Sequence, residues 1–387
     1  MHRVYIRDST LREGVELPGI SMDLGDRLEI ARFLDEMGVP ELEIGMPYGL
    51  RDCLPLAAAI RTERLRIKTS ALLLSYSPSL EDEIALVAES QLDRVEMLFP
   101  SSDVLLSNRG YHGIDRGNLA RFVGESLSRA KSTLPCLGVG FVDSTRTDGR
   151  FLGTLVRAAQ EAGTNRAIIY DTTGVATPGS MANLIAAVRA MTDLPLIAHC
   201  HNDFGLATAN SLAGIEAGAW GVDVVSNGLG DRGGNASLEE VVLALEVLHQ
   251  RKTGLRLEMI CALSRLVERK TGYGRPPVKP IVGDFVFLHS PVMHIRSAAS
   301  GNHAGFEPFP PELVGGERRY SFTLPVDYTP ALLPFFETLG LPAPAGDLAT
   351  EVSRRLATAG GSLGLTEADV LRVIEAAAGS RAQRSPA

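Results

Sequence analysis

The sequence predicts a (β/α)8 TIM barrel, followed by a linker subdomain and a small helical C-terminal subdomain. Two observations favour the barrel. Short apolar runs recur at intervals of roughly 25 to 40 residues, and stretches of helical period separate them. Eight such units within about 250 residues fit a closed barrel better than an open sheet. A doubly wound sheet would give the same alternation, so the alternation alone does not exclude that fold.

Strands are expected where β-branched and apolar residues cluster. These clusters cover residues 4–6, 41–44, 65–69, 94–98, 136–141, 167–170, 196–199 and 222–225. Between the first two clusters, apolar residues recur at the spacing of one helix face, at Leu28, Ile30, Ala31, Leu34 and Met37. After the last cluster, Ser237–Glu240 has the form of a capping box that opens a helix over 241–248.

The barrel is expected to end near residue 275, where this rhythm breaks. Residues 276–325 are rich in proline, glycine and histidine and show little periodicity, which is typical of a linker subdomain. Helical spacing returns after residue 330. The predicted domains are therefore a catalytic barrel over 1–275, a linker subdomain over 276–325 and a helical subdomain over 326–387.

Composition narrows the class of protein. The formal net charge is -8, so an acidic surface argues against a nucleic-acid partner. No apolar run reaches the ~18 residues that a membrane span needs, and the first residues contain no secretory apolar region. The four cysteines lie far apart without a CxxC pair, as in a reducing compartment. We therefore expect a cytoplasmic protein with no membrane partner.

The strongest local signal for chemistry is His199-Cys200-His201. Residues i and i+2 of a strand point the same way, so both imidazoles face one side. At the end of a seventh barrel strand, that side is the mouth where barrel enzymes keep their active sites. Two adjacent imidazoles suit a divalent metal. Two ordinary histidines at a strand end explain this short pattern equally well.

Two further clusters follow the first and last expected strands. Arg7–Gly14 combines cations and carboxylates ahead of a glycine turn. Val225–Asn235 is a glycine-rich loop before a helix, and such loops often bind phosphate through backbone N–H groups. Its spacing is neither that of a P-loop nor that of a dinucleotide fingerprint.

Taken together, five motifs resemble one family of enzymes. They are Asp8–Gly14, Leu42–Pro47, Tyr170–Pro178, His199–Asn210 and Asn227–Asn235. The chain is similar to the metal-dependent acyl-CoA condensing enzymes, namely 2-isopropylmalate, citramalate and homocitrate synthases, which share a barrel with hydroxymethylglutaryl-CoA lyase. The resemblance implies an acyltransferase. Such an enzyme performs a Claisen-type condensation of acetyl-CoA, or another acyl-CoA, with a 2-oxo acid, and releases a 2-alkylmalate-type product and CoA.

The resemblance also implies a metal site. Glu13, His199 and His201 would hold a divalent ion (zinc, manganese or magnesium), with Asn235 as a weaker candidate ligand. Asp203 would support the histidines.

The remaining roles concern the substrates. Arg12 would stabilise the developing alkoxide, Glu43 would orient Arg12, and Thr172 would bind the carboxylate of the 2-oxo acid. His294 would act as acid or base at the acyl-CoA methyl carbon. In the family this histidine comes from the other subunit, so a homodimer is expected.

The chain departs from the family where the acceptor's side chain is recognised. Val142 replaces a glutamate of strand five, Gly138 replaces the homocitrate synthase arginine, Glu16 replaces a glutamine and Phe306 replaces a tyrosine. Gly140 and Val142 are then expected to contact substrate. The glycines predict a wider, more apolar pocket, which favours a neutral acceptor with a bulky side chain over 2-oxoglutarate.

Two other functions remain open. A lyase or aldolase of the hydroxymethylglutaryl-CoA lyase type would use the same scaffold. Such lyases carry a cysteine in the loop after strand eight, and Asn227–Asn235 contains none, which favours a synthase. A catalytically inactive homologue with a binding role is the third reading, motivated by Val142 and Phe306.

Overall fold

The computed structural model describes residues 3–45, 49–107, 113–344 and 346–382. Met46 and Pro47 of the second family motif lie outside these residues. The chain forms two compact units. One comprises Met1–Arg256 and Leu263–Gly274, and the other comprises Leu257–Ala262 and Arg275–Ala387.

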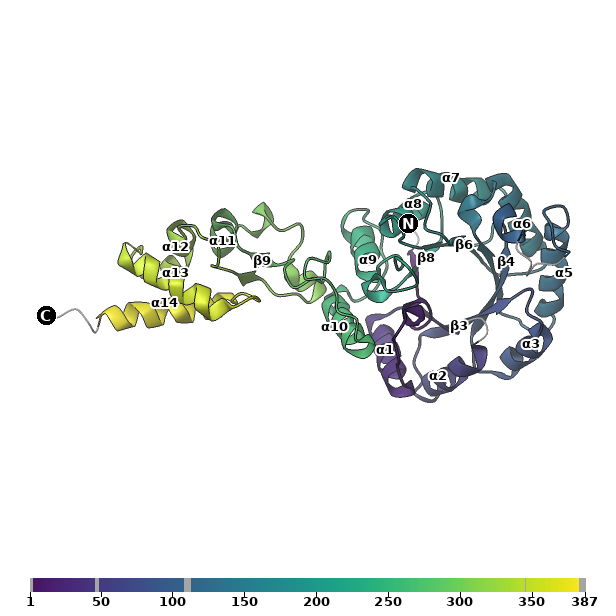
Figure 1. Cartoon of the computed structure of the whole chain (residues 1–387), viewed down its shortest axis with the longest axis horizontal. Helices are drawn as coiled ribbons and strands as arrows, with labels where there is room; N and C mark the ends of the chain where they lie inside the picture. Colours follow the sequence, from purple (N-terminus) through teal and green to yellow (C-terminus); the bar gives the residue numbers. More distant parts are fainter. Residues whose placement is uncertain (1–2, 46–48, 108–112, 345, 383–387) are drawn as a thin grey trace. The chain divides into compact units, whose positions relative to one another are not determined.

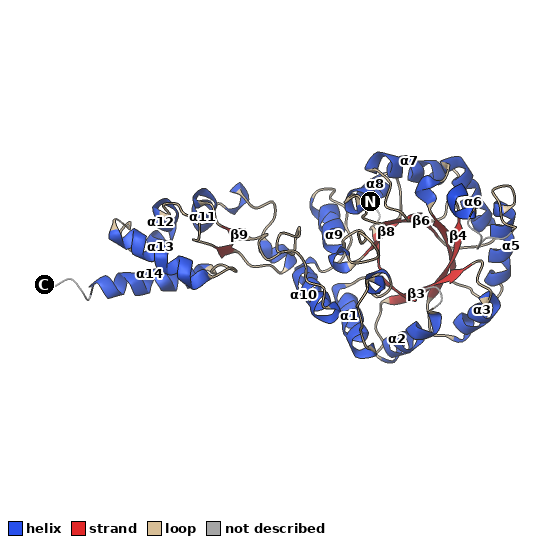
Figure 2. Ribbon diagram, in the orientation of Figure 1, coloured by secondary structure: helices blue, strands red, loops and turns tan. Residues whose placement is uncertain are grey.

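The first unit contains a closed barrel of parallel strands in chain order, with β8 returning to pair with β1 (Figures 1 and 2). This confirms the predicted (β/α)8 barrel. The strands are β1 (Tyr5–Asp8), β2 (Glu41–Gly45), β3 (Lys68–Leu74), β4 (Arg94–Pro100), β5 (Leu137–Val142), β6 (Ala167–Asp171), β7 (Leu196–Cys200) and β8 (Gly221–Val224). The third strand was predicted to start at Leu65, but β3 starts at Lys68. The first residues of the predicted apolar run belong instead to the connection that follows α2.

Helices surround the barrel, as Figure 2 shows. They are α1 (Leu24–Met37), α2 (Leu50–Thr62), α3 (Leu80–Glu89), α4 (Asp103–Leu106), α5 (Leu119–Lys131), α6 (Gly149–Glu161), α7 (Pro178–Arg189), α8 (Ala207–Glu216), α9 (Leu238–Val247) and α10 (Ile260–Thr271). The helix predicted after Ser237 is present as α9. Its capping box is not, because Ser237 makes no side-chain cap hydrogen bond.

An ionic cluster fills part of the barrel interior. The Arg7 guanidinium is fully buried and donates hydrogen bonds to Glu41 at 3.0 Å, Glu43 at 2.5 Å, Glu96 at 3.0 Å and Asp223 at 2.8 Å. Buried charges persist when they are paired in this way. Arg7 thereby links β1 to β2, β4 and β8 beneath the carboxyl ends of the strands.

The second unit has its own hydrophobic core. Its helices are α11 (Val292–Ala299), α12 (Thr329–Thr338), α13 (Asp347–Gly360) and α14 (Glu367–Ala382), with the short strands β9 (Leu288–His289) and β10 (Arg319–Tyr320). Ile295 of α11 is buried in one cluster with Phe336, Leu356 and Ile374. The segments predicted as a linker and a helical subdomain therefore share one core within this unit.

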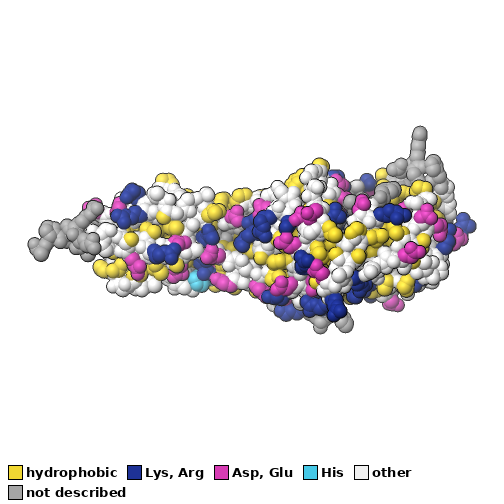
Figure 3. All heavy atoms as spheres, turned by 90° about the horizontal axis from the view of Figure 1, so that it is seen from below, with side chains coloured by type: hydrophobic (Ala, Val, Ile, Leu, Met, Phe, Trp, Pro, Cys, Tyr) yellow, Lys and Arg dark blue, Asp and Glu magenta, His cyan; other side chains and the backbone are white. Residues whose placement is uncertain are grey.

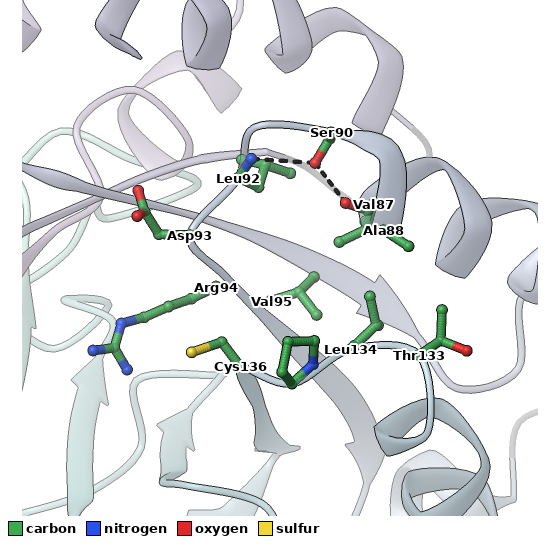
Figure 4. A pocket seen from close by; sticks show the side chains of 11 residues that line it. Val87, Ala88, Ser90, Leu92, Asp93, Arg94, Val95, Thr133, Leu134 and Cys136 are labelled. Atoms are coloured by element: carbon green, nitrogen blue, oxygen red, sulfur yellow. Dashed lines mark hydrogen bonds between the residues drawn. The ribbon is translucent and has the colours of Figure 1, made fainter. Parts of the chain in front are cut away.

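Two surface features lie away from the barrel mouth. Figure 4 shows a small pocket where β4 and β5 begin, lined by Arg94, Cys136 and other residues. On the face drawn in Figure 3, side chains of both charge signs are interspersed.

No helix in the described part of the chain has the length and apolar character to cross a membrane.

Candidate metal centre and active site

Three side chains meet at the carboxyl ends of the strands. Glu13 follows β1, His199 lies near the end of β7, and His201 directly follows that strand. Glu13 Oε1 lies 3.2 Å from His199 Nε2 and 3.8 Å from His201 Nε2, and the two Nε2 atoms are 3.4 Å apart. All three are buried, and their ligand atoms lie within 4.8 Å of one another. A carboxylate and two imidazoles in this arrangement fit a divalent ion.

The three side chains and their charged neighbours shift one another's pKa values. Burial alone would lower the pKa of His199, but Asp223 and Glu13 raise it to about 9. Burial and the neighbouring His199 lower the pKa of His201 to about 4. Burial opposes ionisation of Glu13, yet Arg12 and the histidines hold its pKa well below the usual value. Metal ligands must be deprotonated, so an ion would displace the proton that His199 otherwise holds.

Asn235 completes the candidate ligand set. It pairs with His201 in an isolated bridge, and its Nδ2 lies 3.5 Å from Glu13 Oε2. Its Oδ1 is buried without a hydrogen-bond partner among the described residues, as a ligand oxygen would be. The glycine-rich loop brings it there by close backbone packing. A Cβ on Gly234 would lie 2.1 Å from the carbonyl oxygen of Gly228.

Arg12 lies beside the trio and is held from two sides. Its Nε donates to Glu43 Oε2 at 2.6 Å, and its Nη1 donates to Glu13. Glu43 also accepts from Ser9 at 2.9 Å. The Nη2 of Arg12 is buried and has no partner in the described structure. Glu16 lies 3.6 Å from Arg12, and burial together with the negative charge of Glu13 raises the pKa of Glu16 to about 7.

The residue that orients His199 is Asp223, not Asp203. Asp223 Oδ2 lies 2.9 Å from His199 Nδ1 and also accepts from Arg7. Asp203 instead accepts from Arg232 at 2.9 Å and 3.1 Å, toward the surface. The expectation for Asp203 is therefore wrong. The sequence did contain a signal for Asp223, because it is the only charged residue within the apolar run of the eighth strand.

The predicted substrate residues Thr172, Gly140 and Val142 lie at the ends of β6 and β5. Thr172 Oγ1 accepts from the backbone N–H of Asp143 at 2.8 Å, and Val142 is half-buried.

The expected widening at the glycines is wrong. A Cβ on Gly140 would lie 2.4 Å from Leu98 Cδ2 and 2.8 Å from Tyr170 Cε2, so neighbours already fill that space. At Gly138, Glu96 and Arg166 fill it at 3.2 Å.

His294 belongs to the second unit, where α11 carries it. Its ring stacks on Phe306, with centroids 3.8 Å apart, and lies 6.1 Å from the ring of His289. His289 in turn lies 2.9 Å from Glu307. His294 is therefore part of an aromatic and imidazole cluster rather than an isolated surface histidine.

Curated relatives of the chain are synthases. A probable 2-isopropylmalate synthase of Methanopyrus kandleri is 39% identical over 317 residues, which are 82% of this chain and 62% of that protein. The chain thus spans less than two thirds of that relative. Homocitrate synthase 1 of Nostoc sp. is 37% identical over 82% of this chain and 83% of its own length. A putative (R)-citramalate synthase of Methanopyrus kandleri is 35% identical over 98% of this chain and 74% of its own length.

Solved structures share the fold at lower identity. The hydroxymethylglutaryl-CoA lyase of Pseudomonas aeruginosa superposes with a TM-score of 0.59 at 22% identity, covering 70% of this chain and 94% of the lyase. The carboxyl transferase domain of Rhizobium etli pyruvate carboxylase gives a TM-score of 0.56 at 18% identity, covering 95% of this chain and 62% of that one. The HMGL-like family model matches residues 3–267. The chain therefore belongs to the HMGL-like family.

Proposed function

We propose that this chain is an acyltransferase that condenses acetyl-CoA, or another acyl-CoA, with a 2-oxo acid, and that water then cleaves the thioester to give a 2-alkylmalate-type product and CoA. The observation that carries the proposal is the convergence of Glu13, His199 and His201 beside Arg12, whose buried Nη2 has no partner in the described structure. A divalent ion (zinc, manganese or magnesium) held by the trio, with Asn235 as a further ligand, would supply Lewis-acid polarisation of the ketone. The synthase names of the relatives support the same class.

The protein's own donors surround the expected position of the acceptor. Arg12 Nη2 would donate to the ketone oxygen as it gains negative charge during carbon–carbon bond formation. Glu43 is the positioning residue, because its 2.6 Å contact fixes Arg12 Nε. Thr172 already accepts from Asp143, so its hydroxyl hydrogen is free to donate to the acceptor's carboxylate. Val142 would line the path of the acceptor's side chain, and Gly140 would border that path only through backbone atoms, because Leu98 and Tyr170 fill the space beside its Cα.

The acyl donor needs a group that removes a proton from the carbon next to the thioester. His294 is the candidate acid–base residue, since an imidazole ring can both accept and donate a proton. We place it over the metal centre of a second copy of the chain in a homodimer, as the family resemblance implies. Its stacking on Phe306 supports a defined ring orientation.

The test is release of CoA thiol from acetyl-CoA with a panel of 2-oxo acids, with and without a chelator. His201→Ala should lose both bound metal and CoA release. His249→Ala is the matched control, because His249 lies outside the site beside Glu216 and should retain both. Full turnover by the His201 variant or by metal-stripped protein would overturn the proposal. Cleavage of hydroxymethylglutaryl-CoA without any 2-oxo acid reaction would establish the lyase instead.

A further inference from the structure

Tyr170 fills the space in the barrel mouth beside Gly140, which has no side chain of its own. It sits on β6, one residue before Asp171, and is only 5% exposed. Its ring edge approaches Gly140 so closely that a Cβ there would lie 2.8 Å from Tyr170 Cε2. The centroid of the same ring lies 4.5 Å from that of His199. The tyrosine therefore stands between a candidate metal ligand and the space above β5.

The hydroxyl of Tyr170 is buried and has no hydrogen-bond partner in the described structure. Buried polar groups almost always have a partner, so a buried hydroxyl left unpaired in a binding site points to a ligand oxygen. A phenolic hydroxyl carries a hydrogen that it can donate to a ligand oxygen. Arg12 Nη2 is a second unpartnered donor of the same site.

One wall beside Tyr170 is apolar. Leu72, Leu74 and Leu98 from β3 and β4 form one buried cluster with it, and Val142 packs against this cluster. Arg146 follows β5, but its Nε donates to Asp143 at 2.8 Å. A second carboxylate on the acceptor that reached these leucines would be buried without a partner, which is unfavourable for a charged group.

We propose that Tyr170 determines acceptor specificity: its hydroxyl donates a hydrogen bond to an oxygen of the bound 2-oxo acid, and its ring limits the acceptor to a short, uncharged side chain. The inference rests on the proposed function for the class of acceptor. It reverses the expectation of a bulky acceptor, because the space left by Gly140 is already occupied.

The experiment measures two quantities for pyruvate, 2-oxobutyrate, 4-methyl-2-oxopentanoate and 2-oxoglutarate. One is kcat/KM for CoA release, and the other is calorimetric binding of each acid to metal-loaded protein without acyl-CoA. Wild-type protein should prefer pyruvate over 4-methyl-2-oxopentanoate in both measurements. Tyr170→Ala should shift that ratio at least tenfold toward the longer acid. Tyr170→Phe should lower kcat/KM about tenfold for every acid while keeping their order.

Controls separate specificity from folding. Tyr5→Phe removes another barrel hydroxyl, which donates to Glu41 at 2.8 Å, and should leave the ratio unchanged. Metal content and thermal melting check each variant, and Tyr170→Leu replaces the alanine variant if that one loses its metal. A wild-type preference for the long acid, or a ratio within twofold after truncation, overturns the inference.

The binding measurement distinguishes this inference from the proposed function. If no acid supports CoA release but pyruvate binds more tightly and Tyr170→Ala reverses the order, the acyltransferase proposal fails and the role of Tyr170 stands. If wild-type protein releases CoA but Tyr170→Phe behaves as wild type in both measurements, the hydroxyl's role fails and the acyltransferase stands. A metal-loaded protein that binds none of the acids overturns both.

Discussion

Asp223 offers a sharp test of how the metal centre is supported. Its Oδ2 lies 2.9 Å from Nδ1 of His199, and it accepts from Arg7 at 2.8 Å. A carboxylate at this place fixes the ring orientation and makes the opposite nitrogen, Nε2, a better metal ligand. Asp223→Asn keeps the size of the side chain and removes the charge. The variant therefore perturbs the support of one ligand without removing a ligand.

The expected loss is 10- to 100-fold in metal affinity, or about 1.4 to 2.7 kcal/mol. We expect a loss of this size because the side chains of His199 and Asp223 are almost completely buried, at 1% and 2% exposure, so solvent does not screen their contact. Unfolding of the barrel is a lesser risk, since Arg7 keeps its bonds to Glu41, Glu43 and Glu96.

The assay is competition for zinc or manganese against a chromophoric chelator, with thermal melting of the metal-free protein as the check on folding. Asp203→Asn is the matched control. Asp203 pairs with Arg232 rather than with a histidine, so its variant should bind metal within threefold of wild type. The reasoning is refuted if Asp223→Asn binds as wild type does, or if Asp203→Asn loses as much affinity.

Three further outcomes are expected. Burial raises the pKa of Asp8 from 3.8 to about 7. The unfolded state therefore releases this proton first, and stability falls as pH rises from about 4 to 7. In urea unfolding, the free energy of unfolding of Asp8→Asn minus that of wild type should be larger at pH 8 than at pH 5. An equal difference at the two pH values would contradict this. Gly140→Ala should cost about 1–3 kcal/mol in unfolding free energy, because its methyl group meets Leu98, and Leu98→Ala should recover part of the loss. Mixing inactive His294→Ala and His201→Ala chains should restore some CoA release through hybrid dimers, whereas no recovery would argue against a shared active site.

The barrel could be predicted because its strands are the most apolar, β-branched segments of the chain and recur at a regular interval. All eight appear in the expected order. The third was displaced, since the apolar run around Leu65 and Ile67 belongs partly to the connection that follows α2. Periodicity detects where an apolar run occurs, but hydrogen bonding to the neighbouring strand decides where the strand begins.

The grouping of Glu13, His199 and His201 could be predicted because the two histidines stand two positions apart at the end of one strand and Glu13 follows a motif with its own signature. The support of His199 could not, because it depends on register. β7 pairs with β8 through Ile197 with Gly221 and Ala198 with Val222, so the next step along both strands brings His199 beside Asp223. Sequence proximity favoured Asp203 instead, and proximity along the chain is a poor guide to which side chains face each other across a sheet.

The pocket was mispredicted for a related reason. A glycine removes its own side chain, but protein interiors are close-packed, so the neighbours decide whether space remains. Gly140 pairs with Leu98 on β4 and with Ile168 on β6, two residues before Tyr170. Both flanking strands thus present large side chains toward the gap, and Leu98 and Tyr170 close it. A glycine on a barrel strand is therefore evidence for a bulky neighbour as much as for a cavity. For this chain, we therefore expect the ring of Tyr170, rather than the absent side chain at Gly140, to decide how large an acceptor can bind.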